Sequence, residues 1–254
     1  MPKLILPIIF IISVLFLIYL VKIKIVTTIK FFPFDEEVTI ENASTNITLN
    51  GGSDIIWTIK SNSSEPSFLR QDVSLLYENG KFKGVHSQWK QNIAELEASY
   101  RFPSTYSAKI EAISFHHAEL HRYQDQITSA QKMTYEQAYL VKENETYNLF
   151  KEPENKKETT WKEKLDQMTE RQLKFHWNQL MNYFQIDKDQ YILIPLTDLS
   201  LYENNPFPNL NQTETNEVIG KLWEGLYKNY ILRLRESDNQ YKEHYEPLIL
   251  VAKD

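Results

Sequence analysis

The chain contains no cysteine among its 254 residues. Disulfide bonds, thiolate metal sites, a cysteine nucleophile and a lipid-modified cysteine are therefore excluded. Glycine is also scarce, since the chain has only six, and none of them forms the glycine-rich turn that lets backbone amides approach a phosphate. Nucleotide binding is consequently disfavoured.

Basic residues are neither dominant nor clustered. The formal net charge is -6, and acidic and basic residues are mixed along the chain and not separated into blocks. Neutralising nucleic-acid phosphates requires a basic stripe or patch, so we expect no nucleic-acid partner. The hydrophobic content of 42% and the aromatic content of 13% are typical of a chain that folds around a core.

The longest apolar stretch runs from Leu4 to Val21 and is interrupted only by Pro7, Ser13 and Tyr19. As a helix it would extend about 27 Å at about 1.5 Å per residue, just enough to cross a hydrocarbon core of about 30 Å. It is followed by Lys22 and further apolar and basic residues rather than by a small-residue cleavage site. The pattern predicts an uncleaved, single-pass anchor within residues 1–30, with the lipid bilayer as the partner of residues 4–21.

The side of the membrane on which the body lies is less clearly indicated. Lysines at 22, 24 and 30 favour a cytoplasmic body, because positive charge flanking a span tends to stay inside. A short positive N-terminus ahead of one apolar helix, followed by the acidic residues 35–37, is instead typical of an exported, anchored domain. We expect a protein anchored in the cell membrane with an extracytoplasmic body, and we keep a cytoplasmic-facing body as the alternative. The bias toward Lys, Asn, Ile and Glu suggests a bacterial protein.

Residues 31–150 have the patterns of an antiparallel β-sheet. Runs of β-branched and aromatic residues predict strands at 38–40, 54–59, 72–77, 81–89, 94–102, 109–121 and 127–141. Asn79-Gly80 between two of these runs is a strong hairpin signal, because both residues tolerate positive φ. Residues 93–99 fit a short helix as well as a strand.

Residues 151–254 read as an α/β half packed with the first as one body. A charged, proline-containing segment, 151–157, marks the boundary. Apolar residues recur at helical spacing from Trp161 to Phe184 and again across 214–235, with Thr159 or Thr160 as the cap of the first helix. Apolar runs at 191–196 and 248–252 read as strands. Two such strands separated by a helix suggest a parallel βαβ crossover, and the predicted fold class is α+β.

The best chemical candidate is the group His117, Glu119 and His121. On a strand these odd-numbered residues project from one face, and two imidazoles with a carboxylate are suitable ligands for zinc or a similar divalent metal. On a helix, His117 and His121 would be neighbours instead. The competing interpretation is a solvent-facing strand surface without a metal.

Other motifs give weaker signals. The chain has no Gly-x-Ser-x-Gly elbow and no supported Ser-x-x-Lys motif. Asp187-Lys188-Asp189 lacks the further oxygen ligands of a calcium loop and fits a polar turn. Aromatic residues at helical spacing could line a groove but fit a helical core better; they are Trp161, Trp177, Trp223, Tyr227 and Tyr230.

The sequence therefore favours a membrane-anchored binding or interaction module without catalysis and without a cofactor, whose partner is an envelope protein or polymer. The alternative is a metal-dependent hydrolase that uses His117, Glu119 and His121. A third hypothesis is a cytoplasmic-facing domain tethered to the membrane.

Overall fold

The computed structural model describes residues 32–123, 126–232 and 244–253. The predicted anchor, residues 4–21, lies outside these ranges and stays a prediction. Within the described ranges, no helix has both the length and the apolar character needed to cross a membrane.

Six strands form one antiparallel sheet, which confirms the predicted character of the first half. They are β1 (Ser44–Leu49), β2 (Asp54–Glu78), β3 (Lys81–Pro103), β4 (Ala108–His121), β5 (Ile127–Glu143) and β6 (Thr146–Phe150). Their order is β1-β2-β4-β5-β6, and β3 pairs with β2 on the side opposite β4. β3 includes residues 93–99, which excludes the helix considered for them. The short strands β1 and β6 were not predicted.

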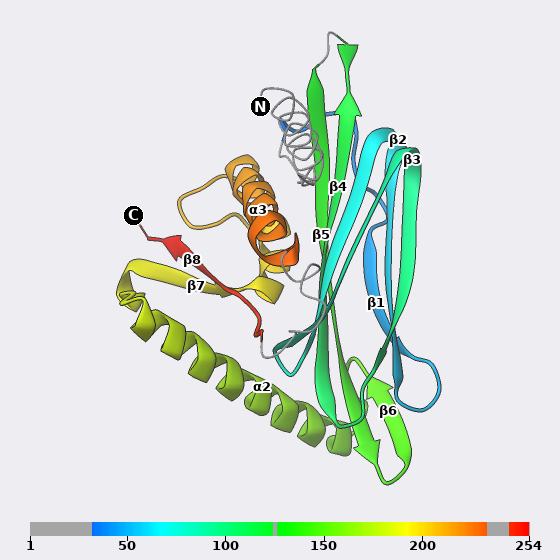
Figure 1. Ribbon diagram of the computed structural model, residues 1–254, viewed down its shortest axis with the longest axis vertical. Helices are drawn as coiled ribbons and strands as arrows, with labels where there is room; N and C mark the ends of the chain where they lie inside the picture. Colours follow the sequence, from blue (N-terminus) through cyan, green and yellow to red (C-terminus); the bar gives the residue numbers. More distant parts are fainter. Residues whose placement is uncertain (1–31, 124–125, 233–243, 254) are drawn as a thin grey trace, which may run out of the picture.

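The long hairpin of β2 and β3 bends in the middle, so that the two parts of β2 pair with different strands. The first part of β2 pairs with β1, whereas the part from Leu69 to Glu78 pairs with β4. Between them the β2–β3 register shifts from Asn62 to Ser67, and Asn92 on the opposite strand has a φ of 56°. A register shift of this kind bends a strand. The sheet therefore curls toward a barrel, with β1 lying over β4 and β5 (Figure 1).

The hairpin turn itself is the one predicted. Glu78 pairs with Lys81 across the turn, and Asn79 and Gly80 have φ values of 50° and 73°. This geometry suits Asn-Gly, since glycine has no Cβ to clash at positive φ. Gly80 also lies against a helix: a Cβ added there would be 2.7 Å from two side-chain carbons of Leu173.

Two apolar clusters occupy opposite faces of the sheet. Inside the curl, Ile47, Ile55 and Trp57 pack against even-numbered residues of β4 such as Ile110. On the outer face, odd-numbered residues, among them Ile113 and Phe115, pack under the helices. The pattern follows from the period of two along a strand, and it leaves both faces of β4 buried.

The second half covers this outer face. It consists of α2 (Lys156–Tyr183), the short 3-10 helices η3 (Lys188–Gln190) and η4 (Leu196–Glu203), β7 (Tyr191–Pro195), α3 (Gln212–Leu226), the π-helical turn η5 (Tyr227–Ile231) and β8 (Leu248–Ala252). The cap of α2 is Asn155, whose side chain accepts from the Glu158 amide, and not Thr159 or Thr160. Asn211 and Glu214 form a capping box at the start of α3.

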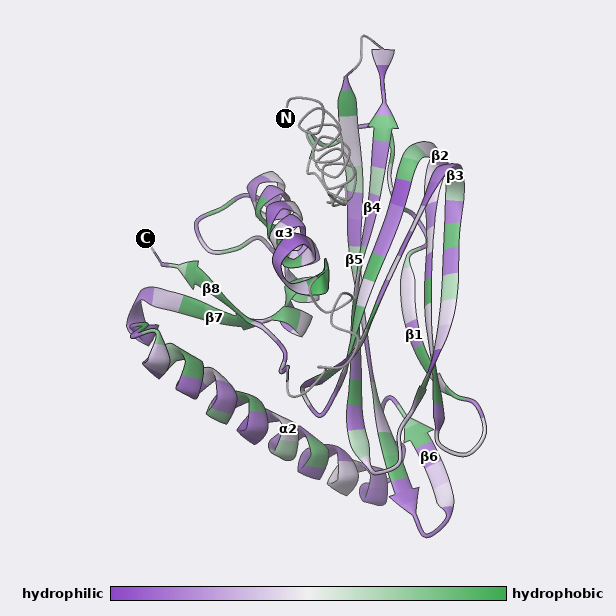
Figure 2. Ribbon diagram, in the orientation of Figure 1, coloured by the Kyte–Doolittle hydropathy of each residue, from purple (hydrophilic) through white to green (hydrophobic). Residues whose placement is uncertain are grey.

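The predicted parallel βαβ crossover is wrong. β7 and β8 pair antiparallel, with Tyr191 opposite Ala252, in a two-stranded sheet of their own. Apolar residues on both faces suggested burial on both sides, but only one face packs on the core, through Ile192, Ile194, Ile249 and Val251. The other face is partly open, and both strands are coloured as hydrophobic in Figure 2.

The segment 38–40 is also not a strand, since only Ile40 forms an isolated bridge, to Ser63. Its apolar residues are nevertheless buried, because Val38 and Ile40 pack against Ala118 and Leu120.

Just before this segment, residues 32–35 lie alongside the start of β5. Phe34 forms a parallel bridge to Ser129. The Ser129 amide donates to the Pro33 carbonyl at 2.8 Å, and the Asp35 amide donates to the Ser129 carbonyl at 2.9 Å. The Asp35 carboxylate accepts two hydrogen bonds from Arg122, at 2.6 and 2.7 Å. We call residues 32–35 with these partners the Asp35 clamp.

Candidate functional site

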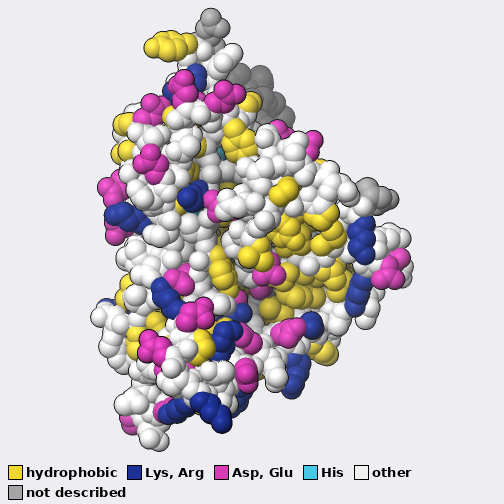
Figure 3. Space-filling model, turned by 180° about the vertical axis from the view of Figure 1, so that it is seen from behind, with side chains coloured by type: hydrophobic (Ala, Val, Ile, Leu, Met, Phe, Trp, Pro, Cys, Tyr) yellow, Lys and Arg dark blue, Asp and Glu magenta, His cyan; other side chains and the backbone are white. Residues whose placement is uncertain are grey.

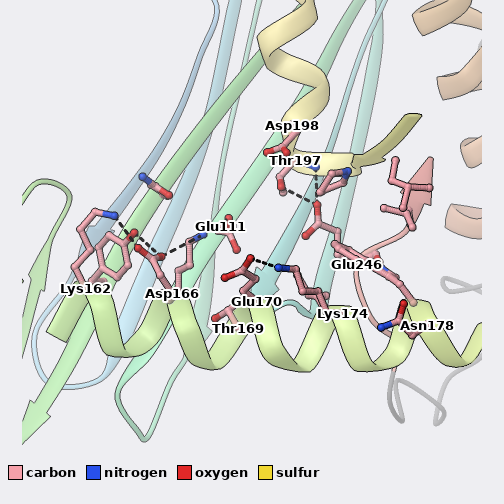
Figure 4. A pocket seen from close by; sticks show the side chains of 18 of the residues that line it. Glu111, Lys162, Asp166, Thr169, Glu170, Lys174, Asn178, Thr197, Asp198 and Glu246 are labelled. Atoms are coloured by element: carbon pink, nitrogen blue, oxygen red, sulfur yellow. Dashed lines mark hydrogen bonds and ion pairs between the residues drawn. The ribbon is translucent and has the colours of Figure 1, made fainter. Parts of the chain in front are cut away.

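A groove of about 710 Å³ separates α2 from the sheet and from the β7–β8 pair. Figure 3 shows apolar side chains gathered on the face over β7, β8 and α2, with charged side chains beside them. Figure 4 shows side chains of α2, of β4, of η4 and of the segment before β8 converging on the groove. The groove therefore has an apolar part and a charged part.

The apolar part is built by helical and strand periodicity. Leu173, Trp177 and Met181 recur every four residues of α2 and so point to the same side. Leu193 and Leu248 come from the face of β7 and β8 that the core does not cover. The Trp177 indole N–H donates to the Glu246 carbonyl at 2.8 Å, which ties α2 to the segment before β8.

The charged part begins with a paired network. Lys109 Nζ lies 2.8 Å from Glu111 Oε1 and 3.6 Å from Asp166 Oδ1. Lys162 donates to Asp166 at 2.7 Å, and the Tyr139 hydroxyl donates to the same carboxylate at 2.9 Å. Burial raises the pKa of Asp166, but the hydrogen bonds from Lys162 and Tyr139 outweigh it, and the net shift is downward. The charges of the two lysines and the two carboxylates therefore offset one another.

Glu246 has a different environment. It is buried, and its Oε1 accepts from both the amide and the hydroxyl of Thr197, each at 2.7 Å. Burial, and then the negative charge of Glu111, raise the pKa of Glu246 to about 8, although the Thr197 hydrogen bonds oppose the shift. No lysine, arginine or histidine in the described ranges forms an ion pair with it. At neutral pH much of the population is therefore protonated.

Asp198 follows Thr197 and lies at the exposed rim of the groove. Partial burial and the charge of Glu111 raise its pKa, whereas Lys109 lowers it. Like Glu246, it forms no ion pair within the part of the chain that the structure describes. The groove thus contains two carboxyl groups without a cationic partner.

Thr169 adds a third polar group. Its side chain lines the groove from α2 and is 3% exposed, and its hydroxyl has no hydrogen-bond partner among the described residues. Buried hydroxyls are normally hydrogen-bonded, because desolvating one without compensation is costly. This hydroxyl is therefore an unsatisfied polar group buried in the wall of the groove.

The predicted metal ligands lie elsewhere, on the odd-numbered face of β4. His117 is fully buried there, with Nε2 at 3.7 Å from Glu119 Oε1. His121 is exposed, and its ring stacks on Phe68 with 3.7 Å between the ring centroids. Within the described ranges, no three His, Asp or Glu residues are grouped so that they could hold a metal. Zinc binding by the three residues stays a prediction, and only two of them are brought close.

The competing interpretation, a solvent-facing strand surface, fails for His117 and Glu119. The sheet face that they occupy is covered, since the neighbouring Phe115 ring stacks on Trp223 of α3. Gln71 and Gln131 lie opposite His117 on the adjacent strands. Neither ring nitrogen of His117 and neither glutamine side-chain oxygen has a hydrogen-bond partner within the described residues. Sequence reasoning missed this row because it depends on strand register.

Sequence reasoning also missed the groove residues. Glu111 alternates with Ile113 and Phe115 and so shares the outer face of β4 with them, but no local pattern in the sequence brings Glu246 near it. Of the aromatic residues assigned to a helical core, Trp223 and Tyr227 are buried as expected, whereas Trp177 lines the groove. Asp187 caps the turn η3 by accepting from the Asp189 amide, which agrees with the polar turn.

Comparison with protein-family models, with curated proteins and with solved structures finds no match.

Proposed function

We propose that the chain is a non-catalytic binding module whose groove between α2 and the β7–β8 pair takes an apolar segment of an envelope protein or polymer. Residues 4–21 would tether the module to the cell membrane, with the body on the outer face. The observation that supports binding is the groove itself, because its walls present apolar side chains to solvent beside a few convergent polar groups. That combination is characteristic of ligand sites.

The alternative, a metal-dependent hydrolase at His117, Glu119 and His121, has as its support the 3.7 Å approach of His117 to Glu119. The groove is the better-formed site, since it offers space and unpaired polar groups together.

Binding is tested by titrating the full-length chain in lipid nanodiscs with octanol and following tryptophan fluorescence. Empty nanodiscs correct for partitioning of octanol into lipid. We expect a saturable change that is lost in Trp177→Phe. Leu193→Arg should abolish the saturable change, because Leu193 lines the groove and is 37% exposed, so the arginine fills the site without disturbing the core.

The matched control is Leu201→Arg, because Leu201 is 63% exposed and does not line the groove. It should bind octanol as the unsubstituted chain does. Equal loss in both variants, or no saturable change at all, contradicts the assignment of the groove.

Attachment and side are tested in cells. Alkaline carbonate should leave the full chain in the membrane pellet and release a chain that lacks residues 1–30. Protease added to intact spheroplasts should digest the body. Protection of the body would refute the outer-face assignment and favour the cytoplasmic-facing alternative.

A further inference from the structure

The carboxyl groups of the groove outnumber the cations available to them. The groove is lined by Glu111, Asp166, Glu170, Asp198 and Glu246, and by three lysines. Lys109 pairs with Glu111, Lys162 with Asp166, and Lys174 with Glu170. Each lysine is therefore already used, and Asp198 and Glu246 are left without a cation in the described part of the chain.

The free position on Glu246 becomes an acceptor once its carboxyl is ionised. Glu246 Oε1 is occupied by Thr197, but no hydrogen bond from a described residue reaches Glu246 Oε2. A carboxylate can accept about four hydrogen bonds, so this oxygen has capacity to spare. The Thr169 hydroxyl is buried without a partner on the opposite wall, formed by α2. Figure 4 shows Glu246 and Asp198 on the η4 side of the groove, with the Glu170–Lys174 pair of α2 on the other side.

We propose that this end of the groove is a subsite for a primary ammonium group attached to an apolar chain, held by Glu246 and Asp198. The inference rests on the proposed function and names the ligand class of the same groove. An ammonium group is a compact cation with three donors and no acceptor, so it complements two carboxyl groups that have no cationic partner. The apolar wall of Trp177, Met181 and Leu193 continues from this end and would contact the chain.

Binding by this subsite is coupled to a proton. The groups that face Glu246 are Glu111 on β4, Asp198 on η4, and the hydroxyls of Tyr77, Tyr135 and Tyr230, with Lys109 beside Glu111. The ion pair of Glu170 with Lys174 lies on the α2 wall opposite. In the free protein, burial and Glu111 keep the Glu246 carboxyl largely protonated at pH 7. A bound ammonium favours the carboxylate, so binding releases a proton, and the affinity rises with pH from about 6 to about 8.

The test compares octylamine, octanol and octanoate, which share one apolar chain, on the full-length chain in nanodiscs. We expect octylamine to bind at least tenfold more tightly than octanol at pH 8, and octanoate to bind more weakly than octanol. Calorimetry in two buffers of different ionisation enthalpy should show proton release with octylamine alone.

Glu246→Gln should weaken octylamine at least tenfold, remove its pH dependence and change octanol binding less than twofold. Because Glu246 is buried, Asp198→Asn at the exposed rim serves as a second variant, with an expected severalfold loss for octylamine. Glu217→Gln on α3 is the matched control, since Glu217 also lies beside a lysine, Lys221, but does not line the groove; it should change nothing.

The amine could belong to a lipid or to a lysine side chain. Acetyl-Leu-Lys-Leu-amide and its norleucine analogue distinguish the sources: preference for the lysine peptide supports a polypeptide ligand, and preference confined to octylamine supports an amine of the lipid type. Equal binding of octylamine and octanol would overturn the ammonium subsite but would still support the groove as a binding site. Failure of every probe would overturn the groove as well.

Discussion

Replacing Gly80 by alanine tests how the β2–β3 turn supports the groove. Gly80 has a φ of 73°, and its carbonyl accepts the Glu246 amide at 2.9 Å. A Cβ there would lie 2.7 Å from both Cγ and Cδ2 of Leu173, which is buried on α2. The substitution therefore has two costs: it strains the backbone of the turn, and its Cβ overlaps the Leu173 side chain in the wall of the groove.

The two costs can be added. A left-handed conformation costs a non-glycine residue about 1–2 kcal/mol, and overpacking a filled site costs about 1–3 kcal/mol. We expect Gly80→Ala to lower the free energy of unfolding by about 2–5 kcal/mol. Gly52→Ala is the matched control, because Gly52 has a φ of 53° but nothing within 4 Å of the added Cβ. Its cost should be the backbone part alone, about 1–2 kcal/mol.

The assay is urea unfolding of the two variants and of Gly80→Ala combined with Leu173→Ala, all in the full-length chain. Removing the Leu173 side chain also removes the clash, so the double variant should be more stable than the sum of its single changes predicts, by about 1–3 kcal/mol. Equal effects of Gly80→Ala and Gly52→Ala, with additive behaviour of the double variant, would refute the close packing of α2 on the turn.

Three further predictions concern single side chains. Asp35→Asn should lower the free energy of unfolding by about 1–3 kcal/mol at pH 7. Because Arg122 holds the pKa of Asp35 well below its usual range, the difference between the two proteins should shrink below about pH 4. Urea unfolding at pH 7 and pH 3 measures it, and an equal difference at both pH values would contradict the prediction. Glu246 keeps in the native state a proton that the unfolded chain loses, so the free energy of unfolding should fall between about pH 4.5 and pH 8, by at most about 1.4 kcal/mol per pH unit. Glu246→Gln should remove this slope, and parallel plots of unfolding free energy against pH for the two proteins would be inconsistent with the raised pKa. Since the His121 ring stacks on Phe68, we expect His121→Ala to leave the zinc content of the purified chain unchanged. If His117→Ala and His121→Ala each removed bound zinc to the same extent, the result would support the three-ligand site instead.

Local signals in the sequence predicted much of the first half. Asn79-Gly80 specifies its own turn because the requirement for positive φ is local, and alternation along β4 and β5 marks strands regardless of what covers them. The bend at residues 62–67 was not predictable in the same way. It depends on a long hairpin folding over β1, and its register shift has no local motif.

The second half shows what periodicity cannot decide. The apolar run 191–196 has the same pattern whether one or both of its faces are buried, so the sequence predicted a parallel crossover where the structure has an antiparallel pair. The groove has the same origin, since the uncovered face of that pair forms its apolar wall. Glu246 and Glu111 are far apart in the sequence, and their effect on one another arises only once α2 and η4 close the space around them.

The Asp35 clamp also determines how the body responds to a pull. Tension entering the chain at Phe32 acts along a segment that runs parallel to β5, and it is resisted by the Ser129 backbone bonds and the Arg122 pair acting in shear. Bonds loaded in shear must break together, whereas bonds loaded in a zipper break one by one. A pull applied at Phe32 would therefore be borne first by the Ser129 backbone bonds and the Arg122–Asp35 pair together.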